Sequence, residues 1–354
     1  MPPQNRSANN RIGEPPLWKP LTAATRLEED SGTFFRDQNA ARYPDHPIEP
    51  ATSVTLARNP RFDAQIVDVF ACASTIGGFL RFVSGAEGRP VRFLVEGVGN
   101  TVFFVRRDNN PDEKITDEQG QLIRGHVHTF PDASTQWQAS MEGSASHQRI
   151  LLYKFAGLRC IIRYEADGYL NEHVGVKIKR KEGAASSGSE TVMPEIAEVE
   201  VRQGGSLVPQ NAVFELKTRS IKRRGEDFLA DQLPRLWISQ TPFFVLAFHT
   251  RSVFDPKDIE ITDVRQGVKQ WEEENAASMR KLGVLMNRLG DLARERDSHQ
   301  EGSLRSAHQV AMSYRHFCIV FERFGSARHI LRAETAANLR RVQAVMRVGW
   351  SGQH

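Results

Sequence analysis

The stretch Phe214-Glu215-Leu216-Lys217-Thr218-Arg219-Ser220 alternates between polar and apolar side chains over its first residues. In an extended strand, successive side chains point to opposite faces. Glu215 and Lys217 would therefore share one face, while Phe214, Leu216 and Thr218 share the other. The pattern predicts a strand that holds a carboxylate and an amine side by side, with a mostly apolar face behind them.

A second acidic stretch lies upstream, where Cys160 to Gly168 reads Cys-Ile-Ile-Arg-Tyr-Glu-Ala-Asp-Gly. Glu165 and Asp167 are two residues apart, so they also share a strand face. If the two strands are neighbours, three carboxylates and a lysine converge. Carboxylate oxygens are the ligands that Mg²⁺ and Mn²⁺ prefer, and such an ion activates water for phosphodiester hydrolysis. The alternative is that each strand has an ordinary solvated polar face, and the spacing alone favours that alternative.

The hypothesis assigns a role to each residue of the two stretches. Asp167 and Glu215 would bind the metal directly, Glu165 would bind or support it, and the Leu216 carbonyl would add a ligand. Lys217 would orient or deprotonate the attacking water, or stabilise developing charge. We expect these side chains to cluster in one cleft, and a structure that places the two strands in different sheets would end the nuclease hypothesis.

The order of elements over about residues 146–250 is an acidic strand, the Glu-x-Lys strand, a helix and a buried strand. This order resembles the core of the PD-(D/E)XK nuclease superfamily, and most of all its decapping-exonuclease (DXO-type) family, which removes aberrant RNA 5′ ends. The matching residues are Glu165-Ala166-Asp167, Glu215-Leu216-Lys217-Thr218, Leu236-Trp237-Ile238-Ser239-Gln240 and Ser146-His147-Gln148-Arg149-Ile150-Leu151. The resemblance implies a link between Gln240 and the metal.

The chain also departs from this family. The family has an upstream acid in a Gly-x-x-x-Glu setting, which has no clean copy here, so Asp132 is the first choice and Glu142 the second. No residue matches the family's substrate-binding arginine. The chain further resembles uncharacterised fungal proteins described as geranylgeranyl diphosphate synthases. Those enzymes hold magnesium diphosphate with Asp-Asp-x-x-Asp motifs, and no adjacent Asp-Asp pair occurs in this sequence.

Composition places the chain among ordinary globular proteins. Of 354 residues, 40% are hydrophobic and 25% charged, and the net charge is +4. The three cysteines are scattered, which argues against a thiolate zinc site and favours a reducing compartment. No apolar run approaches the roughly 20 residues that span a bilayer, and no signal region follows Met1. We therefore expect an intracellular protein, nuclear or cytoplasmic.

The expected architecture is α+β or α/β, with a mixed central sheet. Residues 1–50 form a disordered or draped arm, residues 51–262 a nuclease-like core with a flexible insertion at 180–194, and residues 263–354 a helical region. Helical character is expected from Val264 onward, where apolar residues from Val268 to Leu292 recur at three and four, and further helices over about 304–324 and about 333–348. Packing on the core is the default for these helices, and a face for a protein partner is the alternative.

Clusters of basic residues flank the proposed site and would bind nucleic acid, although such clusters are usually solvated faces. They are Arg219, Lys222, Arg223, Arg224, Lys177, Lys179 and Arg180. The favoured function is Mg²⁺- or Mn²⁺-dependent hydrolysis of RNA phosphodiester or 5′-end (decapping or pyrophosphohydrolase) bonds. The alternatives are a catalytically inactive nuclease fold that binds RNA or a protein, and a DNA nuclease.

Overall fold

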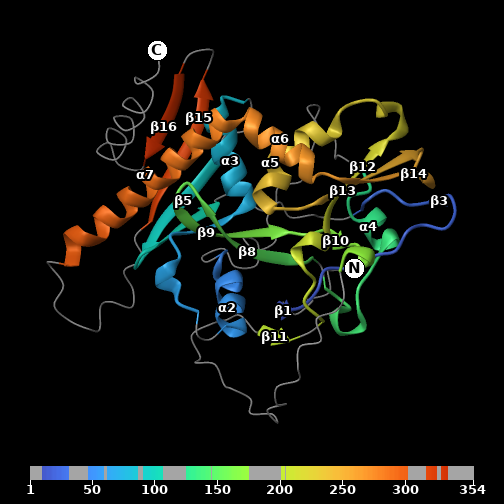
Figure 1. Cartoon of the computed structure of the whole chain (residues 1–354), viewed down its shortest axis with the longest axis horizontal. Helices are drawn as coiled ribbons and strands as arrows, with labels where there is room; N and C mark the ends of the chain where they lie inside the picture. Colours follow the sequence, from blue (N-terminus) through green and yellow to red (C-terminus); the bar gives the residue numbers. More distant parts are fainter. Residues whose placement is uncertain are drawn as a thin grey trace, which may run out of the picture.

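The computed structural model describes ten segments of the chain. They are residues 10–31, 47–59, 62–86, 91–106, 125–144, 146–174, 201–203, 205–301, 316–324 and 328–333. Within them the α+β prediction is confirmed, with the strands divided between two large mixed sheets and one small parallel pair (Figure 1). The predicted flexible insertion at 180–194, with Lys177 and Lys179, lies outside the described residues.

The first large sheet, here the core sheet, has the order β16-β15-β5-β6-β4-β9-β8. Its strands are β4 (Val69–Cys72), β5 (Val91–Val98), β6 (Thr101–Arg106), β8 (Gln148–Phe155), β9 (Leu158–Glu165), β15 (His316–Phe324) and β16 (Arg328–Ala333). The predicted hairpin around Gly97 to Asn100 is confirmed, since β5 and β6 pair antiparallel. β9 pairs antiparallel with β8 and parallel with β4, so it lies inside the sheet.

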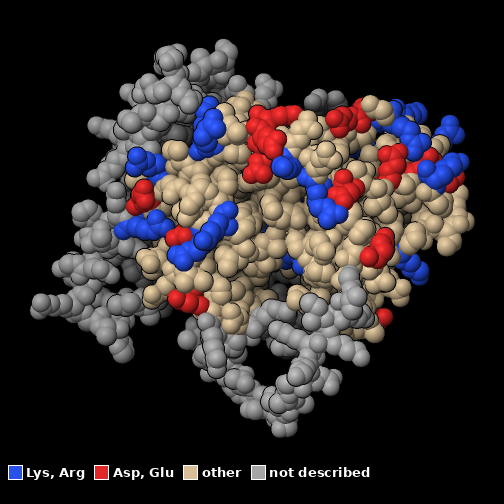
Figure 2. Space-filling view, viewed as in Figure 1, with Lys and Arg blue, Asp and Glu red and all other residues tan. Residues whose placement is uncertain are grey.

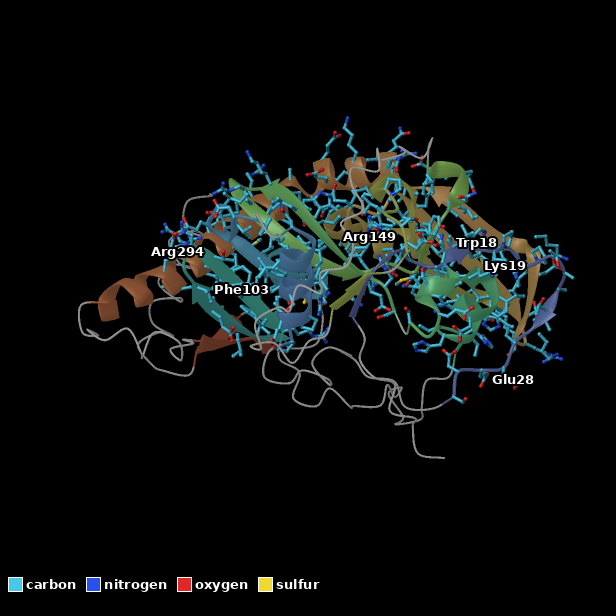
Figure 3. The ribbon with its side chains drawn as sticks, turned by 90° about the horizontal axis from the view of Figure 1, so that it is seen from below. Trp18, Lys19, Glu28, Phe103, Arg149 and Arg294 are labelled. Atoms are coloured by element: carbon cyan, nitrogen blue, oxygen red, sulfur yellow. The ribbon has the colours of Figure 1, made fainter. Side chains whose placement is uncertain are left out.

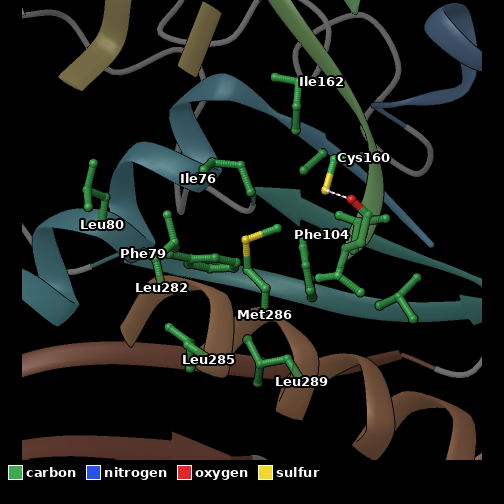
Figure 4. Packing of buried hydrophobic residues seen from close by; sticks show 14 of the residues in the cluster. Ile76, Phe79, Leu80, Phe104, Cys160, Ile162, Leu282, Leu285, Met286 and Leu289 are labelled. Atoms are coloured by element: carbon green, nitrogen blue, oxygen red, sulfur yellow. Dashed lines mark hydrogen bonds between the residues drawn. The ribbon is translucent and has the colours of Figure 1, made fainter. Parts of the chain in front are cut away.

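Two helices cover one face of the core sheet. They are α3 (Ala73–Ser84) and the long α7 (Ala276–Glu301). Buried residues recur every three or four positions on α7, as an amphipathic helix requires. Leu282, Met286 and Leu289 pack against Phe79 of α3 and Phe104 of β6 (Figure 4). α7 therefore packs on the core, which is the default expected for the helices of this region.

The prediction of a helix over about 304–324 is wrong for the described part of that range. Residues His316–Phe324 form β15, which pairs with β5 and with β16. The reason is that Phe317, Ile319 and Phe321 also alternate with period two, and the open edge of β5 offers backbone partners to such a segment. The helix predicted over 333–348 lies almost wholly outside the described residues.

The second large sheet, here the motif sheet, has the order β3-β14-β13-β12-β10-β2-β7. Its strands are β2 (Leu17–Trp18), β3 (Thr25–Arg26), β7 (Thr135–Gln136), β10 (Gly168–Tyr169), β12 (Val213–Ser220), β13 (Phe243–Thr250) and β14 (Val253–Asp263). β12 and β13 are parallel and are joined through α5 (Phe228–Ser239). As the apolar run 243–248 predicted, β13 is central and largely buried, between β12 and β14.

The remaining elements are short or peripheral. They are β1 (Asn10–Ile12), α2 (Glu49–Arg58), η1 (Ala64–Ile66), α4 (Thr129–Ser134), η2 (Ala139–Met141), η3 (Asn171–His173), β11 (Val201–Gln203), η4 (Gln210–Ala212), η5 (Ile221–Arg223) and α6 (Arg265–Glu274). α5 continues through Pro234, although a proline inside a helix usually kinks or divides it. None of the helices in the described segments is long and apolar enough to cross a lipid bilayer.

The described part of the N-terminal arm is draped over the motif sheet and is not disordered. β2 pairs with β10, and the Trp18 ring packs edge-on against Phe214, with ring centroids 5.6 Å apart. Figure 3 shows Trp18, Lys19 and Glu28 along this side of the molecule. Asp30 accepts hydrogen bonds from the backbone N–H groups of Val127, His128 and Thr129, at the start of α4. These bonds cap α4, so the arm also fixes the position of that helix.

Candidate functional site

The chain passes from one large sheet to the other within the Glu165-Ala166-Asp167 stretch. Glu165 is the last residue of β9 in the core sheet, and Gly168 begins β10 in the motif sheet. The expectation that the Glu-x-Asp and Glu-x-Lys strands share one sheet is therefore wrong. The two motifs are nevertheless close in space. β10, which follows Asp167, pairs antiparallel with β12, and Gly168 lies opposite Phe214.

Continuing this register by one residue brings Asp167 opposite Glu215. The Leu216 backbone N–H donates a hydrogen bond of 2.6 Å to Asp167 Oδ2, which joins the two motifs directly. On the other side, the Ala166 N–H donates to the His147 carbonyl at 2.9 Å. The two acidic stretches therefore meet where the two sheets join.

Gly168 makes this close approach possible. A Cβ atom at this position would lie 2.4 Å from Phe214 Cζ and 2.8 Å from the Pro16 carbonyl oxygen. Both distances are far inside van der Waals contact, and neither neighbour is the free end of a flexible side chain. Only glycine therefore lets β10 lie between β2 and β12 with Asp167 against the Glu-x-Lys strand.

Glu215 is buried, with a side chain only 2% exposed, and both of its oxygens are bound by cations. Lys217 Nζ contacts Oε1, as the predicted shared strand face requires, and Arg235 Nε lies 3.1 Å from Oε2. Burial alone would raise the pKa of Glu215, but Lys217 and Arg235 outweigh it and hold the pKa below its usual value. Glu215 is therefore a stable carboxylate anion.

The pKa of Asp167 shifts in the opposite direction to that of Glu215. Burial, followed by the nearby charge of Glu215, raises the pKa of Asp167 to about 7, although Lys217 and Arg235 oppose the change. The pKa of Glu165 is also raised, first by the protein crowded around it, although its side chain keeps contact with solvent. Arg235, Lys217 and His128 act in the other direction on Glu165. Burial, and only after it the charge of Glu215, therefore favours the neutral form of these two acids, whereas Glu215 stays ionised.

The sequence pattern did not predict a role for Arg235, although this cation links α5 to Glu215. The residue of this helix that the resemblance links to the metal is Gln240. Gln240 ends α5 with a positive φ of 51°. Its side chain donates to the Trp237 carbonyl and its carbonyl accepts from Gln210. Its polar contacts in the described chain are therefore with the end of α5 and with Gln210, and not with the acids.

A polar network borders the acids on the β8 side. The Gln210 side-chain amide donates to the Tyr164 hydroxyl at 2.7 Å, and its oxygen accepts from Arg149 Nε at 3.0 Å. Figure 3 places Arg149 between the two halves of the molecule. Burial, followed by the Arg149 charge, lowers the pKa of His147 to about 3, so this ring is neutral at physiological pH. The network joins β8, β9 and the end of α5 around the site.

Asp132 and Glu142, the two candidates for the upstream acid, take part in none of the contacts described above. Asp132 is exposed in the first turn of α4, and Glu142 is exposed immediately after η2. His128, at the start of α4, is close enough to act on the Glu165 charge, so this end of α4 borders the site. Asp132 therefore stays the first choice, as a prediction.

The four described basic candidates follow Glu215 and Lys217 along the chain. Arg219 donates to the Thr218 carbonyl at 2.8 Å, and its guanidinium lies 4.9 Å from the centre of the Phe228 ring. Arg223 pairs with Glu226. Arg224 pairs with Asp258 and Glu260. Lys222 is exposed and has no carboxylate partner among the described residues. On the face shown in Figure 2, Lys and Arg side chains are interspersed with Asp and Glu.

The donor chemistry of the site fits a hard divalent ion, because Asp167, Glu215, Glu165 and the Leu216 carbonyl all offer oxygen. No three His, Cys, Asp or Glu side chains in the described residues are already arranged to hold a metal ion. The metal site therefore stays a prediction. The Glu215 oxygens face Lys217 and Arg235 instead, and Asp167 accepts the Leu216 N–H.

Solved structures show which fold this is. The structure is similar to that of Rai1 from Scheffersomyces stipitis in complex with (3'-NADP)+ and calcium ion, with a TM-score of 0.50 and 10% identity over 94% of this chain and 86% of that one. Candida albicans Rai1 in complex with pU5-Mn2+ gives a TM-score of 0.48 with 8% identity, covering 96% of this chain and 94% of that one. For K. lactis Dxo1 in complex with manganese, the values are 0.40 and 11%, over 82% and 72%.

The likeness to Rai1 confirms the predicted decapping-exonuclease-like fold. No curated protein matches the sequence. The family model described as "Domain of unknown function (DUF8563)" matches residues 6–312, which is most of the chain. The protein is therefore a member of the DUF8563 family.

Proposed function

We propose that this protein hydrolyses phosphodiester or 5′-end pyrophosphate bonds of RNA with the help of Mg²⁺ or Mn²⁺. The observation that carries the proposal is the buried Glu215 carboxylate, which contacts Lys217 and lies opposite Asp167 where the β10–β12 register is continued by one residue. Three acids and a lysine in one place are a costly arrangement for a fold, because each buried charge loses hydration. Phosphoryl hydrolysis needs such a set, and the Rai1-like fold supports this choice.

Each residue of the site would have its own role in hydrolysis. Asp167 and Glu215 would hold the divalent ion, with the Leu216 carbonyl and Glu165 in support. When bound, the ion would neutralise charge on the phosphate and lower the pKa of a water. Lys217 would hold or deprotonate the attacking water, or stabilise the charge that develops on phosphate oxygens. Asp132 and Gln240 stay proposals as further ligands.

The fixed geometry around Asp167 supports this division. The Leu216 N–H occupies Oδ2, which sets the direction of the carboxylate and leaves Oδ1 as the oxygen available to a ligand. The carbonyl of the same residue, Leu216, accepts a hydrogen bond from Lys217 Nζ at 3.1 Å. One peptide segment would thus orient both an acid and the lysine.

One experiment tests the proposal directly. The purified protein with Mn²⁺ is incubated with RNAs that carry a triphosphate, a monophosphate or a cap at the 5′ end, and with single-stranded DNA of the same sequence. We expect cleavage of at least one RNA, lost in Glu215→Gln and retained in Glu272→Gln, whose side chain is exposed on α6. The four substrates separate 5′-end hydrolysis from internal cleavage, and an RNA nuclease from a DNA nuclease.

The second candidate is a nuclease fold that binds RNA or a protein without cutting. The pairing of both Glu215 oxygens with protein cations favours it, because such a site is balanced without a metal. If RNA is bound equally by wild type and Glu215→Gln, and neither protein cleaves it, the binding function replaces the enzymatic one.

A further inference from the structure

The position of Arg235 follows from the packing of α5. Asp227 caps the helix by accepting from the Ala230 N–H at 3.0 Å. The next residues after Arg235 are Leu236, Trp237 and Ile238, which are all buried in apolar clusters. Because these three side chains occupy the inward faces of the helix, Arg235 lies on the remaining face, where its guanidinium reaches Glu215.

Arg235 lies among three acids. Three carboxylates, those of Glu215, Asp167 and Glu165, act together to raise the pKa of Arg235, with Glu215 contributing most. Lys217 is the other cation in contact with Glu215. The position of Arg235 is therefore one where three acids each favour a cation.

The two cations differ in how easily they can leave. Lys217 is 25% exposed, comes from the same strand as Glu215 and also donates to the Leu216 carbonyl at 3.1 Å. The Arg235 side chain is 49% exposed, and its pairing with Glu215 spans two elements, α5 and β12. A long side chain that is half exposed can turn its charged end toward water, whereas the Lys217 ammonium has two partners on its own strand.

Building on the proposed function, we propose that Arg235 is a resident counter-ion, which occupies the place of a divalent cation on Glu215 and is displaced when that cation binds. Its guanidinium compensates the buried carboxylate in the metal-free protein, where an uncompensated charge would be strongly destabilising. The same contact competes with metal, so Arg235 sets the metal affinity of the site and the stability of the metal-free fold together.

The test is calorimetric titration of the full chain with Mn²⁺, for wild type, Arg235→Met, Arg235→Lys and Arg265→Ala. Arg265 is the matched control, because it also pairs with an acid, Asp263, but at an exposed position. Removal of the competing charge should tighten Mn²⁺ binding about tenfold or more in Arg235→Met, equivalent to about 1.4 kcal/mol or more. Arg235→Lys should lie between Arg235→Met and wild type, since lysine keeps the charge but not the planar guanidinium. Arg265→Ala should match wild type.

Melting temperatures provide a second readout that does not depend on turnover. Without metal, Arg235→Met should melt below wild type, because Glu215 keeps only Lys217. Saturating Mn²⁺ should raise its melting temperature by more than it raises that of wild type, as tighter binding to the folded state requires. If Arg235→Met does not fold, the same comparison is made with Arg235→Lys.

The outcomes separate this inference from the proposed function. Unchanged or weaker Mn²⁺ binding in the Arg235 variants, with normal binding in wild type, overturns the counter-ion role and leaves a metal-dependent function standing. Absence of Mn²⁺ binding in every protein overturns both. Binding in Arg235→Met that is tighter than in wild type supports the counter-ion role whether or not RNA is cleaved.

Discussion

Glu215 and Glu14 are both buried, with exposed fractions of 2% and 0%, yet the protein compensates their carboxylates by different means. Around Glu215 the partners are charged side chains, Lys217 and Arg235. Around Glu14 they are neutral, since Oε2 accepts from the Ser206 N–H at 2.9 Å and from the Ser206 hydroxyl. Glu14 Oε1 has no hydrogen-bond partner among the described residues.

The two carboxylates differ in whether their partners can be replaced by another group. A backbone N–H and a short hydroxyl side chain are fixed in place, so Glu14 joins the N-terminal arm firmly to the segment around Ser206. Long charged side chains can move away, and a carboxylate paired with them can accept a different cation. The Glu14 contact therefore belongs to the architecture of the fold, whereas the Glu215 contacts belong to the site that we propose for metal-dependent hydrolysis.

The largest expected effect concerns Lys217. Lys217→Ala should lower RNA turnover by about 10²–10⁴-fold, because a positioned acid–base group typically contributes that much. Mn²⁺ binding should persist, since a protonated amine has no lone pair for metal. Single-turnover cleavage and calorimetry measure the two effects. Lys217→Arg is the control that keeps the charge but not the amine. Near wild-type turnover in Lys217→Ala would show that the lysine serves only to compensate Glu215.

Gly168 offers the next largest effect, because it controls whether the two acidic stretches meet. Gly168→Ala should destabilise the protein by about 3 kcal/mol, at the upper end of the usual cost of overpacking, and abolish Mn²⁺ binding. The clash is with the Phe214 ring and the Pro16 carbonyl. Gly125→Ala is the matched control, since a Cβ there meets nothing within 4 Å. Urea denaturation of both variants measures the difference, and equal stability would mean that β10 can shift away from β12.

The Glu14 contact should cost less to break, since it involves no mobile charge. Ser206→Ala removes the hydroxyl donor but keeps the backbone N–H, so we expect a loss of about 1–3 kcal/mol. Ser146→Ala is the control, because that hydroxyl only accepts a long contact of 3.5 Å from Gln148. Native-state hydrogen exchange should show the loss first in residues 10–31. A uniform loss across the chain would instead show that the arm does not open separately.

Deleting residues 1–31 would test the same contact in a cruder way. Because the arm has no periodic apolar face to bury, the sequence alone predicts that deleting residues 1–45 leaves the fold intact. The structure shows that single residues anchor it instead. Trp18 packs on Phe214, Asp30 caps α4, and Glu14 binds Ser206. Isolated anchors of this kind leave no periodic signal, and that is why the sequence pattern could not reveal them.

The site shows a similar division between what a pattern can and cannot predict. Alternation places Glu215 beside Lys217, because strand geometry is local. The approach of Asp167 to Leu216 depends on a change of sheet at Gly168, and a two-residue strand such as β10 has no sequence signature. Arg235 was overlooked for a related reason. A single arginine on a helix is usually solvated, and only the tertiary position of α5 brings it to three acids.

The smallest expected effect extends the contrast between paired and unpaired charges to the surface. Lys222 is exposed and has no carboxylate partner in the described residues, whereas Arg224 is already paired with Asp258 and Glu260. An unpaired cation that contacts a phosphate releases about one counterion, so Lys222→Ala should reduce the slope of log affinity for RNA against log salt by about 1. Arg224→Ala should change that slope less, because binding RNA would first require its two acids to be released. Fluorescence anisotropy with one RNA at several salt concentrations measures both slopes. A larger change for Arg224→Ala than for Lys222→Ala would mean that RNA displaces the surface acids, and that pairing in the free protein does not predict which cations bind the backbone.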